Sequence, residues 1–359
     1  MSLLFSEIAL GPLTLQNRLV MAPMTRCRAL DNIPNALMAE YYGQRASAGL
    51  IVTEGVSPSP NGLGYPRIPG IFSPAQTEGW KLATDAAHAG GAKIFIQFMH
   101  CGRVAHQLNL PEGARVVAPS AVVASGEMYT DAKGMQPHTV PEAMTEEDIQ
   151  TTIAEYVQAA RNAIEAGFDG VELHSANGYL LEQFIRPNTN QRTDGYGGTI
   201  ENRARFVLEV AEAVCDAIGK DRVGIRLSPY GVFNDMPIYD EMAADYTYLS
   251  EQLNKTGLMY IHLVDHSARG APEVPDNIKE TFRKLFSRTL ILSGGYDARR
   301  AESDLAAGKC DLIAVGRPFL SNPDLVARWK SGATENELNM DTFYTPGPEG
   351  YTDYPVMQE

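Results

Sequence analysis

The sequence is poor in cysteine and in long apolar runs, and each shortage excludes a class of protein. Its four cysteines lie far apart, at positions 27, 101, 215 and 310. None belongs to a Cys-x-x-Cys pair, so the spacing typical of zinc and iron–sulfur sites is missing. No apolar run is long enough to cross a bilayer, and the N-terminal segment lacks the basic start of a signal peptide. The sequence therefore predicts a cytoplasmic protein with reduced thiols and no metal site.

Positive charge is also scarce. The chain carries 30 Lys and Arg against 44 Asp and Glu, which gives a formal net charge of -14. A surface for nucleic acid or for an anionic membrane would need clustered Lys and Arg. We therefore expect no nucleic-acid partner and no membrane partner, and a small molecule is the expected ligand.

The chain does contain a repeated alternation of short apolar runs with helix-like stretches. Most of the runs are continuously apolar, which is typical of strands buried on both faces of a parallel sheet. The eight runs are NRLVMAPM (17–24), LIVTEG (50–55), KIFIQFMH (93–100), GVELHSA (170–176), VGIRLSP (223–229), LMYIHLVDH (258–266), TLILSGG (289–295) and LIAVGRPF (312–319). This pattern predicts a single-domain α/β protein over residues 1–359, a (β/α)8 TIM barrel. A doubly wound sheet is the alternative, but no G-x-G-x-x-G follows the first strand.

Helix caps and loop-like segments fill the spaces between these strands. A Ser-Pro-Ala-Gln capping box opens a predicted helix over 73–90. Further cap and glycine signals predict helices over 145–167 and 199–219. The segment 102–144, after the third strand, has no helical period, and we expect it to cross the barrel top as an excursion. The tyrosine-rich tail from residue 341 is predicted to be a loop.

Polar residues at the carboxyl ends of the strands indicate function, because the active site of such a barrel forms there. Gly294 and Gly295 end the seventh strand, and Gly316 and Arg317 end the eighth. This is the usual place of a phosphate site in the fold. Glycine lets backbone N–H groups approach phosphate oxygens, and a guanidinium adds a forked pair of donors. The alternative is that these glycines only turn the chain.

Two further strand residues extend this site. Gln97 offers both a donor and an acceptor, which suits the amide-like edge of a ring. Arg226 lies within a buried strand, so it needs an anionic or strongly accepting partner if it points inward. A structural ion pair is the alternative for Arg226. A phosphate site, a glutamine that can hydrogen-bond to the amide-like edge of a ring, and an inward-pointing arginine together predict a pocket for flavin mononucleotide (FMN).

His174, Asn177 and Tyr179 stand within six positions at the end of the fourth strand. Two neighbouring N–H donors, one from imidazole and one from amide, would polarise a carbonyl oxygen and stabilise an enolate. A tyrosine hydroxyl would supply a proton. With a hydride from reduced flavin, the three residues would complete addition across an activated C=C bond. The alternative is a core histidine followed by an asparagine turn.

The block HSANGYLLEQFIRPNTNQRTDGYGGTIENRARF (174–206) resembles the signature region of the Old Yellow Enzyme family of FMN-dependent ene-reductases. The motifs APMTR (22–26), QFMHCGR (97–103), GIRLSP (224–229) and VGRPFLSNPDL (315–325) match its pattern in collinear order. Within the family the chain is most similar to the bacterial N-ethylmaleimide reductase and xenobiotic reductase group. The resemblance implies tightly bound, non-covalent FMN and NADPH or NADH as electron donor. It also implies electrophilic alkenes and nitro compounds as substrates, and a monomer or a homodimer.

The resemblance assigns roles to individual residues. His174 and Asn177 would hold the electron-withdrawing oxygen of the substrate, and Tyr179 would donate the proton. The residues implied to line the substrate pocket are Tyr65, Met99 and Tyr344. The residues implied to bind FMN are Ala22, Pro23, Met24, Thr25, Gly55, Gln97, Arg226, Gly294, Gly295, Gly316 and Arg317. Many relatives carry tryptophan where this chain has Met99, which implies a wider pocket.

Two flavin-free hypotheses compete with this interpretation. A barrel aldolase would need a Schiff-base lysine at a strand end, and the strand ends above contain none. A metal-dependent hydrolase would need a cluster of ligands. The histidines available to it are His100, His174, His262 and His266.

Overall fold

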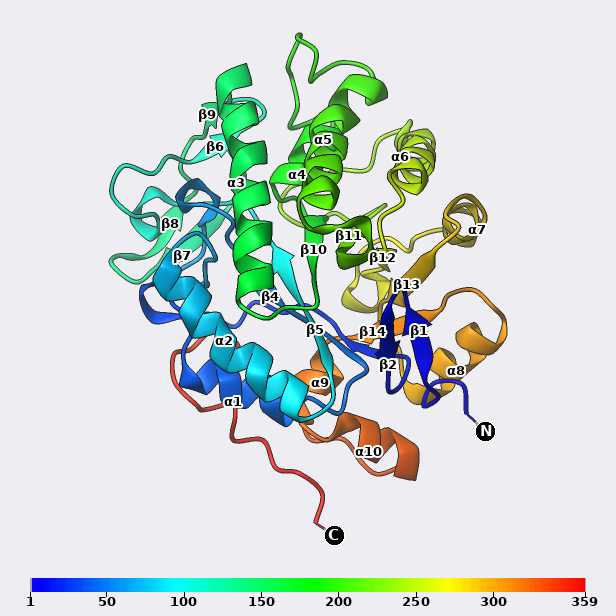
Figure 1. Cartoon of the computed structure of the whole chain (residues 1–359). Helices are drawn as coiled ribbons and strands as arrows, with labels where there is room; N and C mark the ends of the chain where they lie inside the picture. The colour runs from blue at the N-terminus through cyan, green and yellow to red at the C-terminus, as the bar shows by residue number, and fades with distance from the viewer. Residues whose placement is uncertain (1, 359) are drawn as a thin grey trace.

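The computed structural model describes residues 2–358. Its centre is a closed barrel of parallel strands in the order β10-β11-β12-β13-β14-β3-β4-β5 (Figure 1). The strands are β3 (Leu19–Met21), β4 (Leu50–Val56), β5 (Lys93–Phe98), β10 (Gly170–Ser175), β11 (Val223–Leu227), β12 (Tyr260–Val264), β13 (Thr289–Ser293) and β14 (Leu312–Val315). Each predicted apolar run overlaps one of these strands, so the prediction of a (β/α)8 barrel is confirmed.

Helices surround the barrel (Figure 1). The longer ones are α1 (Ala36–Gln44), α2 (Pro74–Ala89), α3 (Glu146–Glu165), α5 (Ile200–Ile218), α6 (Met242–Thr256), α7 (Asp276–Leu285) and α8 (Ala298–Ala306). Shorter helices are α4 (Leu180–Ile185), α9 (Arg317–Ser321) and α10 (Leu325–Ser331), and single 3₁₀ turns are η1 (Leu30–Asn32), η2 (Pro60–Gly62), η3 (Gln107–Asn109), η4 (Lys220–Arg222) and η5 (Ser267–Arg269). Between residues 2 and 358, no helix is long and apolar enough to span a membrane.

The helix caps form where the sequence predicts them. The Ser73 hydroxyl accepts from the Gln76 N–H and the Gln76 side-chain oxygen accepts from the Ser73 N–H, which completes the capping box of α2. Thr145 and Asp148 form a second capping box at the start of α3. Gly219, at φ 92°, ends α5 in a backbone conformation that favours glycine.

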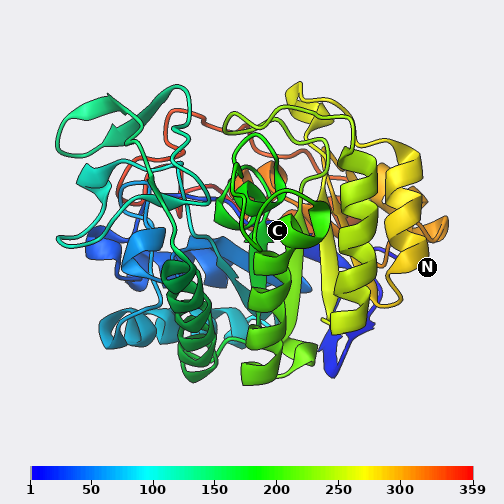
Figure 2. The ribbon, with the colours of Figure 1, turned by 90° about the horizontal axis from the view of Figure 1, so that it is seen from above.

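The strands bury both faces because one face packs on the helices and the other fills the barrel. Ile51 belongs to the cluster between strands and helices, whereas Leu50 and Val52 belong to the interior cluster. A hairpin of β1 (Ile8–Leu10) and β2 (Leu13–Leu15) adds leucines to that interior cluster. Figure 2 shows this hairpin, in dark blue, at one end of the barrel, so the other end is left for the site.

The excursion after β5 lies at that other end, together with the C-terminal tail (Figure 2). It contains two small sheets that the sequence did not predict. One is the antiparallel pair β7 (Glu127–Thr130) and β8 (Gly134–Pro137), and the other is the parallel pair β6 (Val117–Ala118) and β9 (Glu142–Ala143). Strands this short are specified by their tertiary contacts more than by their own sequence pattern.

The C-terminal tail is fixed by buried arginines. Arg28 donates to the carbonyl oxygens of Phe343 at 2.7 Å and Thr342 at 2.8 Å. Arg26 donates to the Gly350 carbonyl at 2.6 Å. These contacts satisfy both the guanidinium groups and the loop carbonyls, and they hold the tail against the end of the barrel where the strands terminate.

Candidate active site

A cavity of about 1200 Å³ opens at the carboxyl ends of the barrel strands. The excursion and the C-terminal tail complete its walls. All of the predicted site residues except Gly55 line this cavity. They are Ala22, Pro23, Met24, Thr25, Tyr65, Gln97, Met99, His174, Asn177, Tyr179, Arg226, Gly294, Gly295, Gly316, Arg317 and Tyr344.

Gly55 lies behind the cavity wall. A Cβ built on Gly55 would lie 2.5 Å from the Met99 sulfur, so glycine is needed here to make room for Met99. The pairing of β4 with β5 is irregular between Val52 and Gly55, which is consistent with a local bulge. A direct contact between Gly55 and a ligand of the cavity stays a prediction.

A buried carboxylate orients Gln97. Glu172 precedes His174 by two positions on β10, so it lies one layer further into the barrel. It accepts from Gln97 Nε2 at 2.8 Å, from the Tyr260 hydroxyl at 3.0 Å and from His262 Nδ1 at 2.9 Å. Burial would raise the pKa of Glu172, but the neighbouring groups, led by His262, lower it below the usual value. The ionised carboxylate takes the amide nitrogen of Gln97, which leaves the amide oxygen for the cavity.

Arg226 is a buried cation without a counter-ion in direct contact. Strand pairing places it beside His174, and it is only 7 % exposed. Its Nε has no hydrogen-bond partner among residues 2–358, and the described part of the chain forms no ion pair with it. Burial lowers the pKa of Arg226, although Glu172 acts in the opposite direction. A buried guanidinium in this state calls for an anionic or strongly accepting ligand.

The glycines at the ends of β13 and β14 differ in what they require. Gly294 has φ 141°, and a Cβ there would lie 2.3 Å from the Asp265 carbonyl oxygen. Gly295 has φ 62°. The protein itself therefore requires glycine at both positions. At Gly316 the nearest protein atom to a built Cβ is 3.4 Å away, which is ordinary contact. Packing therefore does not require glycine at Gly316, which lines the cavity together with Arg317.

His174, Asn177 and Tyr179 converge on the same cavity. The His174 and Tyr179 rings have centroids 5.0 Å apart. Burial, followed by the charge of Arg226, lowers the pKa of His174 well below its ordinary value, so the imidazole is neutral. Asn177 has φ 57°, a left-handed conformation that asparagine tolerates better than most residues. Its amide oxygen lies 2.7 Å from His266 Nε2, which leaves the amide N–H groups for a ligand.

A second hydroxyl lies next to Tyr179. The hydroxyl oxygens of Tyr65 and Tyr179 are 3.0 Å apart, within hydrogen-bonding distance. Burial, with a smaller contribution from Cys101, raises the pKa of Tyr179 above its ordinary value. Cys27 also lines the cavity, and burial raises the pKa of its thiol to about 12. At neutral pH the cavity therefore presents protonated tyrosines and a protonated thiol.

The structure adds residues that the sequence interpretation did not assign to the flavin site. His266 contacts Asn177 from the end of β12, and its position directly after a barrel strand was the available signal. Glu127, Tyr129 and Asp131 reach the cavity from β7 and the turn that follows it. Nothing in the sequence around them marks a site, because the fold of the excursion brings them there.

The histidines proposed for a metal cluster are not assembled into one. His262 is engaged with Glu172 and Ser293, and His266 with Asn177. Within residues 2–358 there is no group of three or more His, Cys, Asp or Glu side chains placed to hold a metal ion. The cavity instead presents the buried guanidinium of Arg226 and hydrogen-bonding side chains at the ends of the barrel strands.

Comparison with known protein families identifies the class of enzyme to which this barrel belongs. Residues 3–336 match the model of the NADH:flavin oxidoreductase / NADH oxidase family. The chain belongs to this family, and it is a flavin-dependent oxidoreductase.

Similar proteins and structures agree over nearly the whole chain. The chain is 42 % identical to 12-oxophytodienoate reductase 1 of Oryza sativa subsp. japonica, over 99 % of this chain and 93 % of that protein. It is 41 % identical to a protein of Leishmania infantum named as a probable flavin mononucleotide-dependent alkene reductase, over 99 % and 97 % of the two chains. A structure of morphinone reductase matches with a TM-score of 0.95 and 44 % identity, over 99 % and 96 % of the chains. An old yellow enzyme homologue from Zymomonas mobilis matches with a TM-score of 0.94 and 40 % identity, over 99 % of each chain. The prediction of an Old Yellow Enzyme-type protein is therefore confirmed.

Proposed function

We propose that residues 1–359 act as one unit that reduces the C=C bond of α,β-unsaturated carbonyl compounds, with NAD(P)H as electron donor. The observation that carries this proposal is the convergence of His174, Asn177 and Tyr179 beside the buried guanidinium of Arg226. A relative named as a probable flavin mononucleotide-dependent alkene reductase supports it, as does one named as a 12-oxophytodienoate reductase. A morphinone reductase structure in complex with tetrahydroNAD, 44 % identical to this chain, supports a nicotinamide donor.

The residues of the cavity fit FMN. The unpartnered Nε and low exposure of Arg226 suit a polar ring edge that accepts hydrogen bonds. The free amide oxygen of Gln97 would read a ring N–H, and Thr25 would contact the ring from the end of β3. Gly316 and the cation of Arg317, which both line the cavity, would receive the phosphate. When bound, FMN supplies the hydride that adds to the β-carbon.

His174 and Asn177 would hold the carbonyl oxygen of the substrate. Because the imidazole is neutral and the Asn177 amide oxygen is occupied by His266, each side chain can offer an N–H to the same acceptor. Negative charge grows on that oxygen as the β-carbon is reduced, and fixed donors in a buried site stabilise it without reorganisation. The positive charge of Arg226, beside His174, acts in the same direction.

Tyr179 would transfer its hydroxyl proton to the α-carbon. Its raised pKa keeps the proton in place until the substrate becomes basic. The Tyr65 hydroxyl, 3.0 Å away, can then return a proton or stabilise the phenolate by a hydrogen bond. Saturated product and neutral tyrosine result when water resupplies the proton.

The test is a pair of half-reactions followed by stopped-flow absorbance. The purified protein should be yellow and should release FMN on denaturation. Anaerobic mixing with NADH or NADPH should bleach the flavin, and 2-cyclohexenone, N-ethylmaleimide and a nitrate ester should each restore the colour. A colourless protein that neither binds added FMN nor oxidises NAD(P)H would refute the proposal.

The phosphate assignment gives a prediction of its own. Arg317→Ala should weaken FMN binding, because a charge-assisted hydrogen bond of this kind contributes about 1.5–3 kcal/mol, or roughly 10- to 150-fold in affinity. The measurement is the Kd of FMN for the apoprotein by fluorescence quenching. Arg299→Ala is the matched control, because Arg299 is an exposed arginine that does not line the cavity. An Arg317→Ala Kd equal to that of the control would contradict the assignment.

A further inference from the structure

The turn that carries Asn177 has an unusual backbone. Asn177 has φ 57° and Gly178 has φ 78°, so two successive residues are left-handed between β10 and α4. Asparagine tolerates a left-handed conformation better than most residues, but the conformation still costs free energy that the surroundings must offset. Because the side chain of Asn177 faces the cavity, whatever holds this turn also sets the direction of its amide.

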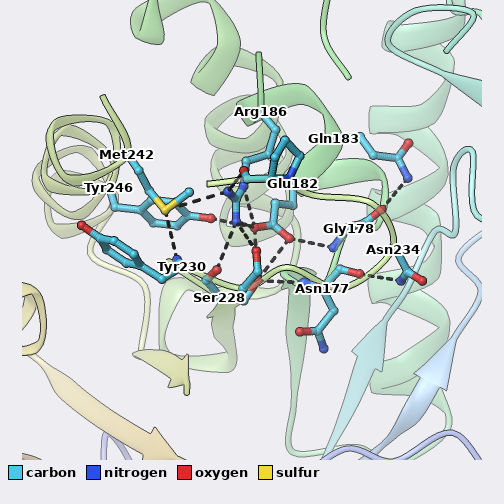
Figure 3. Close-up of polar contacts among 12 residues, drawn as sticks. Asn177, Gly178, Glu182, Gln183, Arg186, Ser228, Tyr230, Asn234, Met242 and Tyr246 are labelled. Carbon is cyan, nitrogen blue, oxygen red and sulfur yellow. Dashed lines mark hydrogen bonds and ion pairs between the residues drawn. The ribbon is translucent and has the colours of Figure 1, made fainter. Parts of the chain in front are cut away.

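The side chain at the centre of these contacts is Glu182, on α4 (Figure 3). Its carboxylate is buried, with 0 % exposure. Glu182 Oε2 accepts from the Gly178 N–H at 2.7 Å. Glu182 Oε1 accepts from Arg186 Nε at 3.0 Å and Nη2 at 2.8 Å, and from the Tyr246 hydroxyl at 2.8 Å. The carboxylate therefore connects a buried ion pair directly to the turn.

Ser228 extends this connection to Asn177 itself. Its hydroxyl lies 3.1 Å from both Glu182 oxygens, and the Asn177 N–H lies 2.8 Å from the same hydroxyl oxygen. A serine hydroxyl has one proton, and an ionised carboxylate can only accept. Ser228 must therefore donate to Glu182 and accept from Asn177, so the direction of this chain of hydrogen bonds is fixed.

The charge state of the cluster supports this direction. Burial would lower the pKa of Arg186, but Tyr246 and Glu182 raise it above the ordinary value. Arg186 is therefore a cation, and the carboxylate that it contacts twice is its anion. Both successive N–H groups of the turn, at Asn177 and Gly178, end on that one anion, directly or through Ser228.

We propose that Glu182 is a positioning residue for alkene reduction, which acts through Ser228 and the Gly178 N–H to aim the Asn177 amide at the substrate oxygen. This inference rests on the proposed function, in which Asn177 is a donor to the substrate. Glu182 itself does not line the cavity. The opposite side of the turn is held by Asn234, which donates to the Asn177 carbonyl at 2.7 Å.

Glu182→Gln tests the carboxylate. The amide that replaces it can accept through only one of its two ends, so it leaves either the Gly178 N–H or Arg186 facing another donor. Because this variant also unpairs a buried guanidinium, it can fail to fold. Ser228→Ala is the second variant, since it removes the link to Asn177 and leaves the ion pair intact. Ser250→Ala is its matched control, because Ser250 is buried and its hydroxyl has no partner among the described residues.

The readouts separate positioning from folding. FMN content should be the same for Ser228→Ala and Ser250→Ala, and both variants should be fully folded at the assay temperature. Ser228→Ala should unfold at the lower temperature of the two, because it leaves the Asn177 N–H without its acceptor. The Kd of 4-chlorophenol, followed by its charge-transfer band with oxidised flavin, should rise in Ser228→Ala, and the limiting rate of reoxidation by 2-cyclohexenone should fall. We expect a loss of roughly 10- to 100-fold in this rate, because a displacement of a reacting group by about 1 Å can slow a reaction by about 10²-fold. Folded Glu182→Gln protein should lose at least as much.

A double variant decides whether the effect passes through Asn177. If it does, Ser228→Ala should cost nothing further in an Asn177→Ala background, because the donor that it positions is gone. Equal losses in both backgrounds, or no loss in Ser228→Ala and folded Glu182→Gln, would overturn the inference about Glu182. An Asn177→Ala enzyme with unchanged 4-chlorophenol affinity and unchanged reoxidation rate would instead overturn the proposed role of Asn177.

Discussion

A His174→Ala enzyme is expected to retain FMN and to be reoxidised by 2-cyclohexenone about 10²- to 10³-fold more slowly than the wild type, the usual effect of removing one fixed donor to a developing oxyanion. The imidazole is 3 % exposed, and the lowered pKa keeps it neutral. Its Nδ1 is buried without a partner among residues 2–358, so no protein acceptor holds the ring proton at Nδ1, and Nε2 can carry that proton toward a ligand. Stopped-flow absorbance of the reduced enzyme mixed with the enone measures the rate.

Two companion variants sharpen this prediction. His174→Asn keeps an N–H donor and should recover part of the lost rate. The double variant His174→Ala/Asn177→Ala should lose less than the product of the two single effects, because both donors serve one oxygen. Strictly independent effects, or a His174→Ala rate close to that of the wild type, would contradict a shared acceptor.

The barrel could be predicted because its strands carry a local signal. A strand buried on both faces is mostly apolar, and most of the eight runs show this within a few residues. The hairpins β1–β2 and β7–β8 carry no such signal. Their strands have three or four residues with partly exposed side chains, so their pairing depends on the barrel end that they cover.

The residues that line the cavity could be predicted to the extent that they end a strand. Gln97, His174, Arg226 and Arg317 all meet that condition, and the fold gathers them in one cavity. The residues that hold them could not be predicted in the same way. Glu182 and Arg186 are spaced i,i+4 on a short helix, a pattern typical of an exposed ion pair. Only the packing of α6 and of the segment after β11 buries the pair.

The contacts of the C-terminal tail could not be predicted either, because they join residues that lie far apart in the sequence. Arg26 belongs to a motif at the end of the first predicted strand, yet its guanidinium donates to carbonyls of Phe343 and Gly350. Periodicity and caps describe neighbours in sequence, and these partners are separated by more than three hundred residues. The partners of Arg26 therefore cannot be predicted from local sequence patterns, because only the complete fold brings them together.

The second large effect is expected for Tyr179→Phe. The variant should bind FMN and accept electrons from NAD(P)H nearly as the wild type does. In the proposed mechanism the Tyr179 hydroxyl takes no part in hydride transfer from NAD(P)H to FMN. Reoxidation by 2-cyclohexenone should slow by about 10²- to 10⁴-fold, the usual contribution of a positioned acid. Tyr156→Phe is the matched control, since the Tyr156 hydroxyl is buried without a partner among the described residues and does not line the cavity.

A change of oxidant distinguishes proton transfer from positioning at Tyr179. A nitrate ester has no α-carbon to protonate, so its reduction should be slowed far less by Tyr179→Phe than the reduction of the enone. The hydroxyl also accepts or donates one hydrogen bond at Tyr65, and Tyr65→Phe measures the loss of that contact while the proton on Tyr179 remains. If Tyr179→Phe slows both oxidants equally, or neither, then Tyr179 is a packing residue and the proton reaches the α-carbon by another route. An equal loss in Tyr65→Phe would instead show that the two hydroxyls deliver the proton as one unit.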